Sequence, residues 1–259
     1  MQGSAHTAAG INRNRCRDRR RSMADNWLQR TELMLGSDAI DKLKHAHVAL
    51  FGVGGVGGYC AEALIRAGIG KITIVDNDDV DVTNINRQII ALHSTVGRPK
   101  TEVMAERLHD ISPDAEVIEK RLFFLLETAG EFDFDDYDYV IDAIDTVKAK
   151  LDLISRCISC GTPIISAMGA GNKTDPSMFR IADISKTEMD PLAKVMRREL
   201  RARGISHLKV VYSPEKPHNT VIQGEGAQAS RHAPGSISFV PPAAGLLLAS
   251  EVVHDLINK

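Results

Sequence analysis

Apolar and polar positions follow one another in blocks between residues 47 and 76. The apolar run Val48–Phe51 predicts a buried strand, and Ile72–Val75 predicts a second one. A glycine-rich turn and a helix-like segment, Tyr59–Ala67, lie between them, and Asp76 ends the second run. The order strand, glycine turn, helix, strand and acid is that of a nucleotide-binding βαβ unit.

Strands and helices continue to alternate further along the chain. They are expected at Thr101–Asp110 (helix), Val117–Ile118 (strand), Tyr137–Ile144 (strand), Val147 to about Cys160 (helix) and Pro163–Ala167 (strand). This alternation predicts a parallel sheet with helices on both faces. The expected fold class is α/β, with a Rossmann-like, mostly parallel central sheet and a smaller C-terminal extension of strands and helices.

The pattern changes after residue 168. Strands are expected at Phe179–Ile184 and Leu208–Tyr212, on either side of a basic helix, Pro191–Arg203. Residues 213–235 are rich in Pro, Gly, His and Ser and predict a long mobile loop. The apolar stretch Ile237–Val253 predicts a strand followed by a buried helix, with Pro241–Ile257 packed back onto the sheet.

The N-terminal part differs from the rest in composition. Residues 1–24 are expected to form a disordered basic extension, because residues 13–21 hold six arginines and one acid. It is either an RNA-binding arm or an upstream extension with Met23 as the natural start. Residues 25–46 then predict a short helical lead-in to the first strand.

Overall composition narrows the class of protein. A net charge of −2 gives no global nucleic-acid signal, and four cysteines in 259 residues indicate a reducing compartment, here taken as the cytoplasm. No apolar core of a secretory signal is visible near the N-terminus. Polar residues and prolines interrupt Ile237–Val253, so no membrane span is expected.

The glycine turn is the first candidate binding site. Its glycines, Gly52, Gly54, Gly55 and Gly57, allow backbone N–H groups to approach a phosphate at a helix N-terminus. Asp76, at the tip of the second strand, can reach a ribose hydroxyl. These features suit NAD and ATP equally.

Polar residues after the second strand favour ATP. Phosphate donors are concentrated between residues 84 and 100, and they are Asn84, Asn86, Arg87, Gln88 and Lys100. Cations here can hold a triphosphate and stabilise charge during attack on the α-phosphorus, which a hydride-transfer site does not need. Asp145 follows another strand and can hold Mg²⁺ against phosphate oxygens, or it can cap the helix that starts near Val147.

Four separated motifs, GVGGVG, IVDNDDVDVTNINRQ, GRPK and DAIDT, together resemble the adenylation domain of the ThiF and MoeB proteins and the ubiquitin-activating enzymes. The resemblance implies an ATP-binding adenylation domain over residues 25–168 and a substrate-facing part over residues 169–259. It implies a cofactor-binding set of Gly52, Gly54, Gly55, Gly57, Asp76, Asp78, Asn84, Arg87, Gln88 and Lys100. It also implies a catalytic set of Arg30, Arg87, Lys100 and Asp145, with Asp145 as the metal ligand. Arg30 matches the arginine that such dimers insert into the partner's site; as an isolated residue it is equally a solvated helix position.

Cysteine spacing helps to choose the branch. Sulfur-carrier activators usually carry two CxxC pairs for zinc, whereas this chain has only Cys157–Cys160, which can be packing residues, a redox pair or half a zinc site. The stretch from Pro163 to Gly204 instead resembles the tRNA threonylcarbamoyladenosine dehydratase branch, most specifically in its motifs between Gly169 and Ala193. That branch has members with a cysteine in the strand that reads Lys209–Tyr212 here, where this chain has none.

The resemblance implies an enzyme that uses ATP to dehydrate and cyclise threonylcarbamoyladenosine next to the tRNA anticodon. Expected cofactors are ATP and Mg²⁺, with a monovalent cation as a further candidate. Expected partners are the modified tRNA, a second copy in a homodimer and a cysteine desulfurase or sulfur-acceptor system. Alternatives are adenylation of a sulfur carrier ending in Gly-Gly, an NAD-binding dehydrogenase, and an ATP-binding scaffold. The basic helix Pro191–Arg203 either contacts RNA or is solvated, and His207, His218 and His232 are expected at the surface.

Overall fold

The computed structural model describes residues 26–218 and 234–258. The predicted extension 1–24, His232 and most of the predicted loop 213–235 lie outside the described residues. The described residues divide into two units, with the boundary between Asp41 and Lys42. The lead-in contains two helices, α2 (Gln29–Leu35) and α3 (Ser37–His45), as the sequence predicts.

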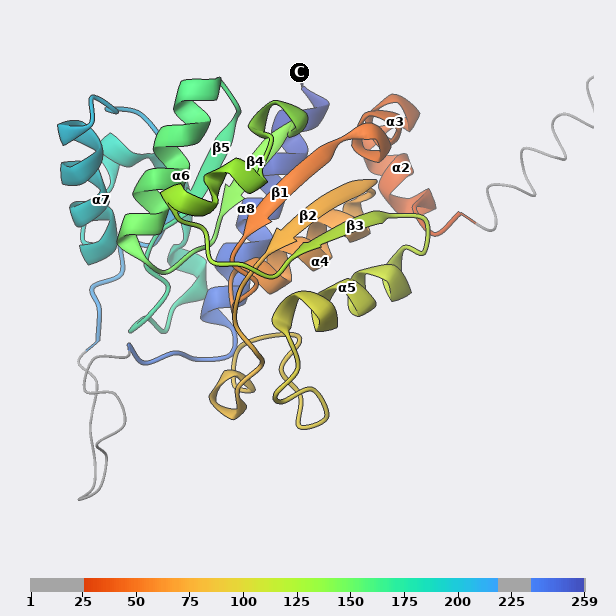
Figure 1. The fold of residues 1–259 in the computed structure, drawn as a ribbon, viewed down its shortest axis with the longest axis horizontal. Helices are drawn as coiled ribbons and strands as arrows, with labels where there is room; N and C mark the ends of the chain where they lie inside the picture. Colours follow the sequence, from red (N-terminus) through yellow and green to blue (C-terminus); the bar gives the residue numbers. More distant parts are fainter. Residues whose placement is uncertain (1–25, 219–233, 259) are drawn as a thin grey trace, which may run out of the picture. The chain divides into compact units, whose positions relative to one another are not determined.

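A seven-stranded sheet forms the centre of the second unit, in the order β3-β2-β1-β4-β5-β7-β6 (Figure 1). Its strands are β1 (His47–Phe51), β2 (Lys71–Val75), β3 (Glu116–Lys120), β4 (Tyr139–Asp142), β5 (Ile164–Ala167), β6 (Arg180–Asp183) and β7 (Lys209–Tyr212). All neighbouring pairs are parallel except β6 and β7, which are antiparallel at the edge. The predicted α/β class with a mostly parallel sheet is confirmed.

Helices cover both faces of this sheet. The helices α4 (Gly57–Ala67), α5 (Lys100–Ile111) and α8 (Val240–Ile257) pack together on one face, and α6 (Val147–Cys160) and α7 (Pro191–Ala202) pack on the other (Figure 1). Short 3₁₀ helices lie at Val82–Asn84, Leu126–Glu131, Phe134–Asp136, Pro176–Met178 and Ile184–Lys186. Strand residues alternate between the two faces, so Ala49 and Phe51 join the core beneath α6.

Aromatic side chains concentrate in the core on the α6 side. The ring of Phe51 lies 5.2 Å from that of Phe124 and 5.1 Å from that of Phe132, between centroids. Phe134 and Tyr137 extend the cluster with an edge-to-face contact at 6.0 Å. Offset and edge-to-face contacts of this kind stabilise beyond the area they bury. The cluster supports the sheet directly below the point where β1 ends.

Two sequence predictions need correction. No strand forms at residues 237–239; a turn leads directly into α8, because Pro241 and Pro242 suit the first turn of a helix and cannot donate to a strand ladder. Strand β4 is shorter than the predicted Tyr137–Ile144 and ends at Asp142. Residues 143–146 are therefore a loop at the carboxyl end of the sheet.

Helix α8 is long and apolar enough to span a membrane by length and composition. Half of that stretch is buried, and it packs against α4 and the sheet. The contact with α4 is close at Gly245, where a Cβ atom would lie 2.2 Å from the carbonyl oxygen of Val56. A glycine is therefore required for α8 to pass so near the start of α4.

Candidate active site

A cavity of about 770 Å³ opens where β1, β2, β4 and β5 end at the carboxyl edge of the sheet. Residues predicted from the sequence line it, and they are Gly52, Gly54, Gly55, Asp76, Asp78, Arg87, Gln88, Lys100 and Asp145. Open α/β sheets bind ligands at this edge. Gly57 and Asn84 are not among the lining residues. Arg30 lies on α2 in the N-terminal unit, and its role in a partner's site stays a prediction.

The glycine loop has the geometry of a phosphate site. Gly52 has a φ of +94°, which disfavours any side chain, and its N–H donates to Val75 O at 2.8 Å. Gly54 is open, because a Cβ added there would meet only Gln88 Nε2, at 3.9 Å. The N-cap residue of α4, Val56, provides no side-chain cap, so N–H groups of the first turn can serve an anion. Gly57 has a packing role, because its Cβ would lie 1.8 Å from Gly52 O.

Asp76 connects the two loops beside the cavity. Its Oδ2 accepts from Val53 N at 2.7 Å and its Oδ1 from Asp78 N at 2.9 Å. Burial raises the pKa of Asp76, and the neighbouring Lys100 partly offsets this effect. The two backbone N–H groups leave further lone pairs of the carboxylate free for a ribose hydroxyl.

Lys100 is the buried cation of the site. It is only 6% exposed, and its Nζ lies 2.7 Å from Asp78 Oδ2 and 3.9 Å from Asp76 Oδ1. Lys100 is the first residue of α5 and lines the cavity. Its ammonium group can therefore replace one of its two carboxylate partners by a phosphate oxygen of a bound nucleotide.

Three predicted residues of the connector have different positions. Arg87 lines the cavity, and its Nη1 donates to Thr83 O at 2.8 Å and to Asn86 Oδ1 at 2.9 Å. Gln88 is 7% exposed and its Oε1 has no hydrogen-bond partner among the described residues. Asn84 instead accepts from Asp81 N at 3.2 Å in a capping box of the 3₁₀ helix. Gln88 thus has spare hydrogen-bonding capacity in the cavity wall, whereas Asn84 shapes the connector.

Asp145 lines the cavity with an exposed carboxylate. The alternative that it caps α6 is wrong, because Thr146 is the N-cap residue and no side chain caps that helix. Within residues 26–218 and 234–258, its carboxylate accepts one hydrogen bond, from Thr146 Oγ1 at 3.2 Å. An exposed carboxylate oxygen beside phosphate donors is the type of ligand that Mg²⁺ uses together with nucleotide phosphates.

A buried ion pair fixes the loop that carries Asp145. Lys150 Nζ lies 2.9 Å from Asp142 Oδ2, and both side chains are fully buried. Lys150 also donates to Ile144 O at 3.1 Å, while Asp142 accepts from Ser166 Oγ at 2.6 Å and from Ile144 N at 3.1 Å. The sequence analysis missed this pair, although Lys150 shares helical spacing with the buried Ile154 and Cys157.

The sequence analysis expected residues 169–259 to face the substrate but named no residue of the opposite wall, which residues 169–173 and 190–192 form together with Pro217, Pro234, Gly235 and Ser236. Its ionisable members are Lys173 and Asp190, whose nearest charged atoms are 3.7 Å apart. Burial lowers the pKa of Lys173 and raises the pKa of Asp190. No sequence spacing links the two residues, which are brought together by the fold alone.

Cys157 is buried in α6 and Cys160 is exposed. Burial raises the pKa of the Cys157 thiol, so it is a poor nucleophile at neutral pH. Among the described residues, no group of three or more His, Cys, Asp or Glu side chains could hold a metal.

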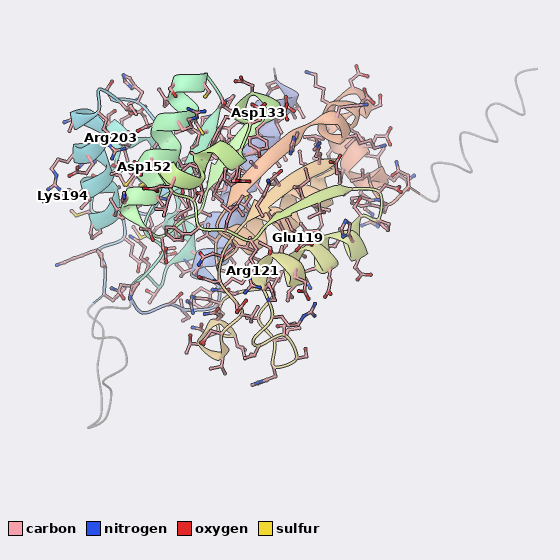
Figure 2. All side chains as sticks on the ribbon, viewed as in Figure 1. Glu119, Arg121, Asp133, Asp152, Lys194 and Arg203 are labelled. Carbon is pink, nitrogen blue, oxygen red and sulfur yellow. The ribbon has the colours of Figure 1, made fainter. Side chains whose placement is uncertain are left out.

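Helix α7 has fewer free cations than its sequence suggests. Arg197 Nη1 donates to Thr187 O at 2.7 Å, Arg203 pairs with Asp152 at 3.0 Å and Arg198 with Glu199 at 2.6 Å. Figure 2 shows Lys194 on the side of α7 that faces away from α6, and Arg203 on the side toward it. His207 and His218 are exposed, with Asp183 and Glu215 as partners at 3.2 and 3.0 Å.

The sheet, the glycine loop and the cations at its carboxyl edge define a nucleotide-binding α/β protein of the adenylating type. The chain belongs to the ThiF family, whose model matches residues 28–259. The predicted resemblance is therefore confirmed at the level of the family.

Relatives within this family carry more specific names. The chain is 47% identical to the tRNA threonylcarbamoyladenosine dehydratase of Bacillus subtilis (strain 168), covering 88% of this chain and 94% of that protein. It resembles the crystal structure of Escherichia coli tRNA N6-threonylcarbamoyladenosine dehydratase, TcdA, in complex with AMP (TM-score 0.82, 36% identity, 92% of this chain and 97% of that one). The complex of the same E. coli protein with ATP gives a TM-score of 0.81, 35% identity and the same coverage.

Proposed function

We propose that the chain is a tRNA threonylcarbamoyladenosine dehydratase, an ATP-dependent enzyme that cyclises this nucleoside next to the anticodon. The observation that supports it best is the composition of a single cavity. One wall carries the glycine loop, Lys100 and Asp145, which suit a nucleotide. The other wall is the segment after β5, and it can face a second substrate because the phosphates of the nucleotide are already bound by the first wall. The likeness to dehydratases of which the chain covers 94% or 97%, one of them solved with ATP and with AMP, supports the same function.

The reaction has two steps that this site can support. A carboxylate oxygen of the threonylcarbamoyl group attacks the α-phosphorus of ATP, and pyrophosphate leaves. The carbamoyl group of the same molecule then attacks the activated carbonyl and gives up a proton, and AMP leaves with the former carboxylate oxygen. The nucleoside has thereby lost the elements of one water, and ATP has become AMP and pyrophosphate. Because both groups belong to one substrate, ring closure is unimolecular, and effective molarities can reach about 10⁵–10⁸ M. No cysteine is required, and none lines the cavity among the described residues.

The residues have separate roles in this scheme. The glycine loop binds the phosphates, Asp76 orients the ribose, and Arg87 and Lys100 offset negative charge on the triphosphate and the leaving pyrophosphate. Asp145 fits a bound Mg²⁺ because its carboxylate is free in the cavity; the ion neutralises phosphate charge when present.

The proposal extends to the surroundings of the enzyme. We place it in the cytoplasm, as a homodimer in which Arg30 reaches the partner's site. A monovalent cation and a sulfur-acceptor system stay as predictions from the family resemblance.

The test uses pyrophosphate release from ATP with tRNA that bears threonylcarbamoyladenosine, together with mass spectrometry of the anticodon nucleosides. The wild-type chain is expected to release pyrophosphate and remove one water from the nucleoside. Asp145→Ala should lower the rate by about 100-fold or more, because it removes a ligand of the charge-neutralising ion. The control Asp135→Ala removes an exposed acid that does not line the cavity and should leave the rate unchanged.

Two results would contradict this function. Release of pyrophosphate only with a small protein that ends in Gly-Gly would assign the chain to sulfur-carrier activation. Binding of NAD without binding of ATP, measured by calorimetry, would exclude adenylation.

A further inference from the structure

Lys173 is a buried lysine in the cavity wall opposite the glycine loop. It is 3% exposed, and its Nζ donates to Ser213 O at 2.9 Å and to Glu215 O at 3.0 Å. The same Nζ lies 3.7 Å from Asp190 Oδ2. Two hydrogens of this ammonium group are therefore donated to backbone carbonyls, and Asp190 faces its charge as an ion-pair partner. Lys173 therefore ties the loop after β5 to the segment after β7.

Asp190 completes the connection. It is 2% exposed; its Oδ2 accepts from Gly169 N at 3.1 Å, and its Oδ1 accepts from Ala193 N at 2.9 Å as the N-cap of α7. The pair Lys173–Asp190 thus joins three segments that are distant in sequence: the exit of β5, the start of α7 and the exit of β7.

Asn172 fixes the same loop from its other side. It has a φ of +58°, unusual for a residue with a side chain, and it exchanges hydrogen bonds with Gly235: its N–H donates to the carbonyl at 2.8 Å and its Oδ1 accepts from the N–H at 2.6 Å. Asn172 O also accepts from His218 N at 2.8 Å. A backbone held in a rare conformation needs surroundings that over-determine it, and they are present here.

The fixed loop has unused donors. Ala170 and Gly171 line the cavity, and no group in the described part of the chain accepts from their backbone N–H groups. Consecutive free N–H groups are a common way to bind carboxylate or phosphate oxygens. The wall thus has donors suited to an acid side chain.

We propose that residues 169–172 receive the carboxyl-bearing side chain of the substrate, and that Lys173 and Asp190 are the positioning residues that fix this wall. This inference rests on the proposed function. A buried ion pair is costly to desolvate, and apolar residues of similar size often stabilise a fold equally well. We therefore assign the pair Lys173–Asp190 the role of holding the wall in one conformation. Lys173 and Asp190 act through the wall, since their charged atoms hydrogen-bond to backbone groups of the segments that form it.

The experiment compares Lys173→Met with a matched variant in the full chain. For Lys173→Met we expect kcat/KM for the modified tRNA to fall about tenfold or more, because small displacements of a reacting group are costly. The Kd for ATP, measured by calorimetry, should change by less than about threefold. Lys173→Arg should recover part of the loss, because it keeps the charge and donors.

The matched control is Lys209→Met. Lys209 lies on β7 and pairs with Glu251 and Asp255 at 2.6 and 2.7 Å, but it does not line the cavity. Its loss should lower thermal stability and leave kcat/KM for the tRNA unchanged.

Equal losses of kcat/KM in both variants would overturn the positioning role, as would a loss of ATP affinity in Lys173→Met that matches its loss toward tRNA. If Lys173→Met does not fold, Asp190→Asn is the test variant, because it keeps an oxygen that can cap α7. A wild-type value of kcat/KM in Asp190→Asn would overturn the inference. A wild-type chain that binds ATP but never releases pyrophosphate would instead contradict the proposed function.

Discussion

Two glycines of one loop show that the same residue type can serve binding or packing. Gly54 has open space around its Cα, so its contribution is access for a phosphate. Gly57 has no such space, because the carbonyl of Gly52 occupies the position of a Cβ. The sequence motif alone predicts the same role for both.

Substituting these glycines separates the two roles. Gly57→Ala should lower the free energy of unfolding by about 1–3 kcal/mol or more, because the added methyl group overlaps a backbone oxygen. Gly54→Ala should leave the free energy of unfolding nearly unchanged and weaken ATP binding. Urea denaturation and calorimetry with ATP check the pair. Equal stability of the two variants would show that the loop relaxes around residue 57.

Sequence reasoning named the residues of one wall of the site but none of the other, for a physical reason. The glycines and Asp145 follow strands closely, so chain order brings them to the carboxyl edge, and Lys100 begins the helix α5 that follows the connector after β2. Lys173 contacts residues that follow β7, 40 and 42 positions away. Nothing in local spacing indicates such a contact.

At the scale of elements, α4 and α5 are joined by a shared carboxylate. Glu62 on α4 accepts from Arg107 Nε on α5 at 2.5 Å and from Arg66 Nε at 2.8 Å. Burial by itself raises the pKa of Glu62, but the hydrogen bonds from Arg107 and Arg66 hold that pKa below its usual value of 4.5. The folded chain therefore binds this proton less tightly than the unfolded chain does.

The stabilisation from Glu62 should depend on pH. It is fully present above the unfolded pKa near 4.5 and is lost as pH falls through the lower pKa of the folded state. Glu62→Gln should therefore lower the free energy of unfolding by about 0.5–1 kcal/mol at pH 7, with a difference that shrinks below pH 4.5. Urea titrations at several pH values measure this, with the exposed Glu127→Gln as a neutral control. A difference that is the same at pH 7 and pH 3 would contradict the role of the ionised carboxylate.

Most helices and strands were predictable because the hydrophobic periodicity of each segment and its length indicate the same type of element. Helix α6 and helix α7 begin where the sequence predicts, at Val147 and Pro191. The wrong strand at residues 237–239 arose from apolar content alone, since the two prolines that follow start a helix. The place of β7 between β5 and β6 required knowledge of the tertiary structure.

At the scale of the whole molecule, the net charge of −2 does not predict contact with RNA. Local charge is more informative, because Lys194 and Arg201 are exposed on α7 and have no acidic partner among the described residues. The start of α7 lines the cavity, so a tRNA whose nucleoside enters there would pass near this helix.

Salt dependence tests this path. Lys194→Ala and Arg201→Ala should each reduce the slope of log Kd for tRNA against log salt by about 0.7–0.9, because each removes one phosphate contact. The Kd for ATP should not change. Arg66→Ala, on the opposite face of the sheet, is the control and should keep the wild-type slope. Unchanged slopes in both α7 variants would mean that RNA approaches over another surface.

The close crossing at Gly245 has a consequence for biosynthesis. Helix α8 backs the start of α4, and Pro241 lies where a Cβ of Gly55 would meet it, at 3.2 Å. A nascent chain on the ribosome has made the glycine loop long before residues 240–245 emerge. The nucleotide site is therefore without this support until residues 240–245 have been made, so we expect ATP binding to follow the synthesis of α8.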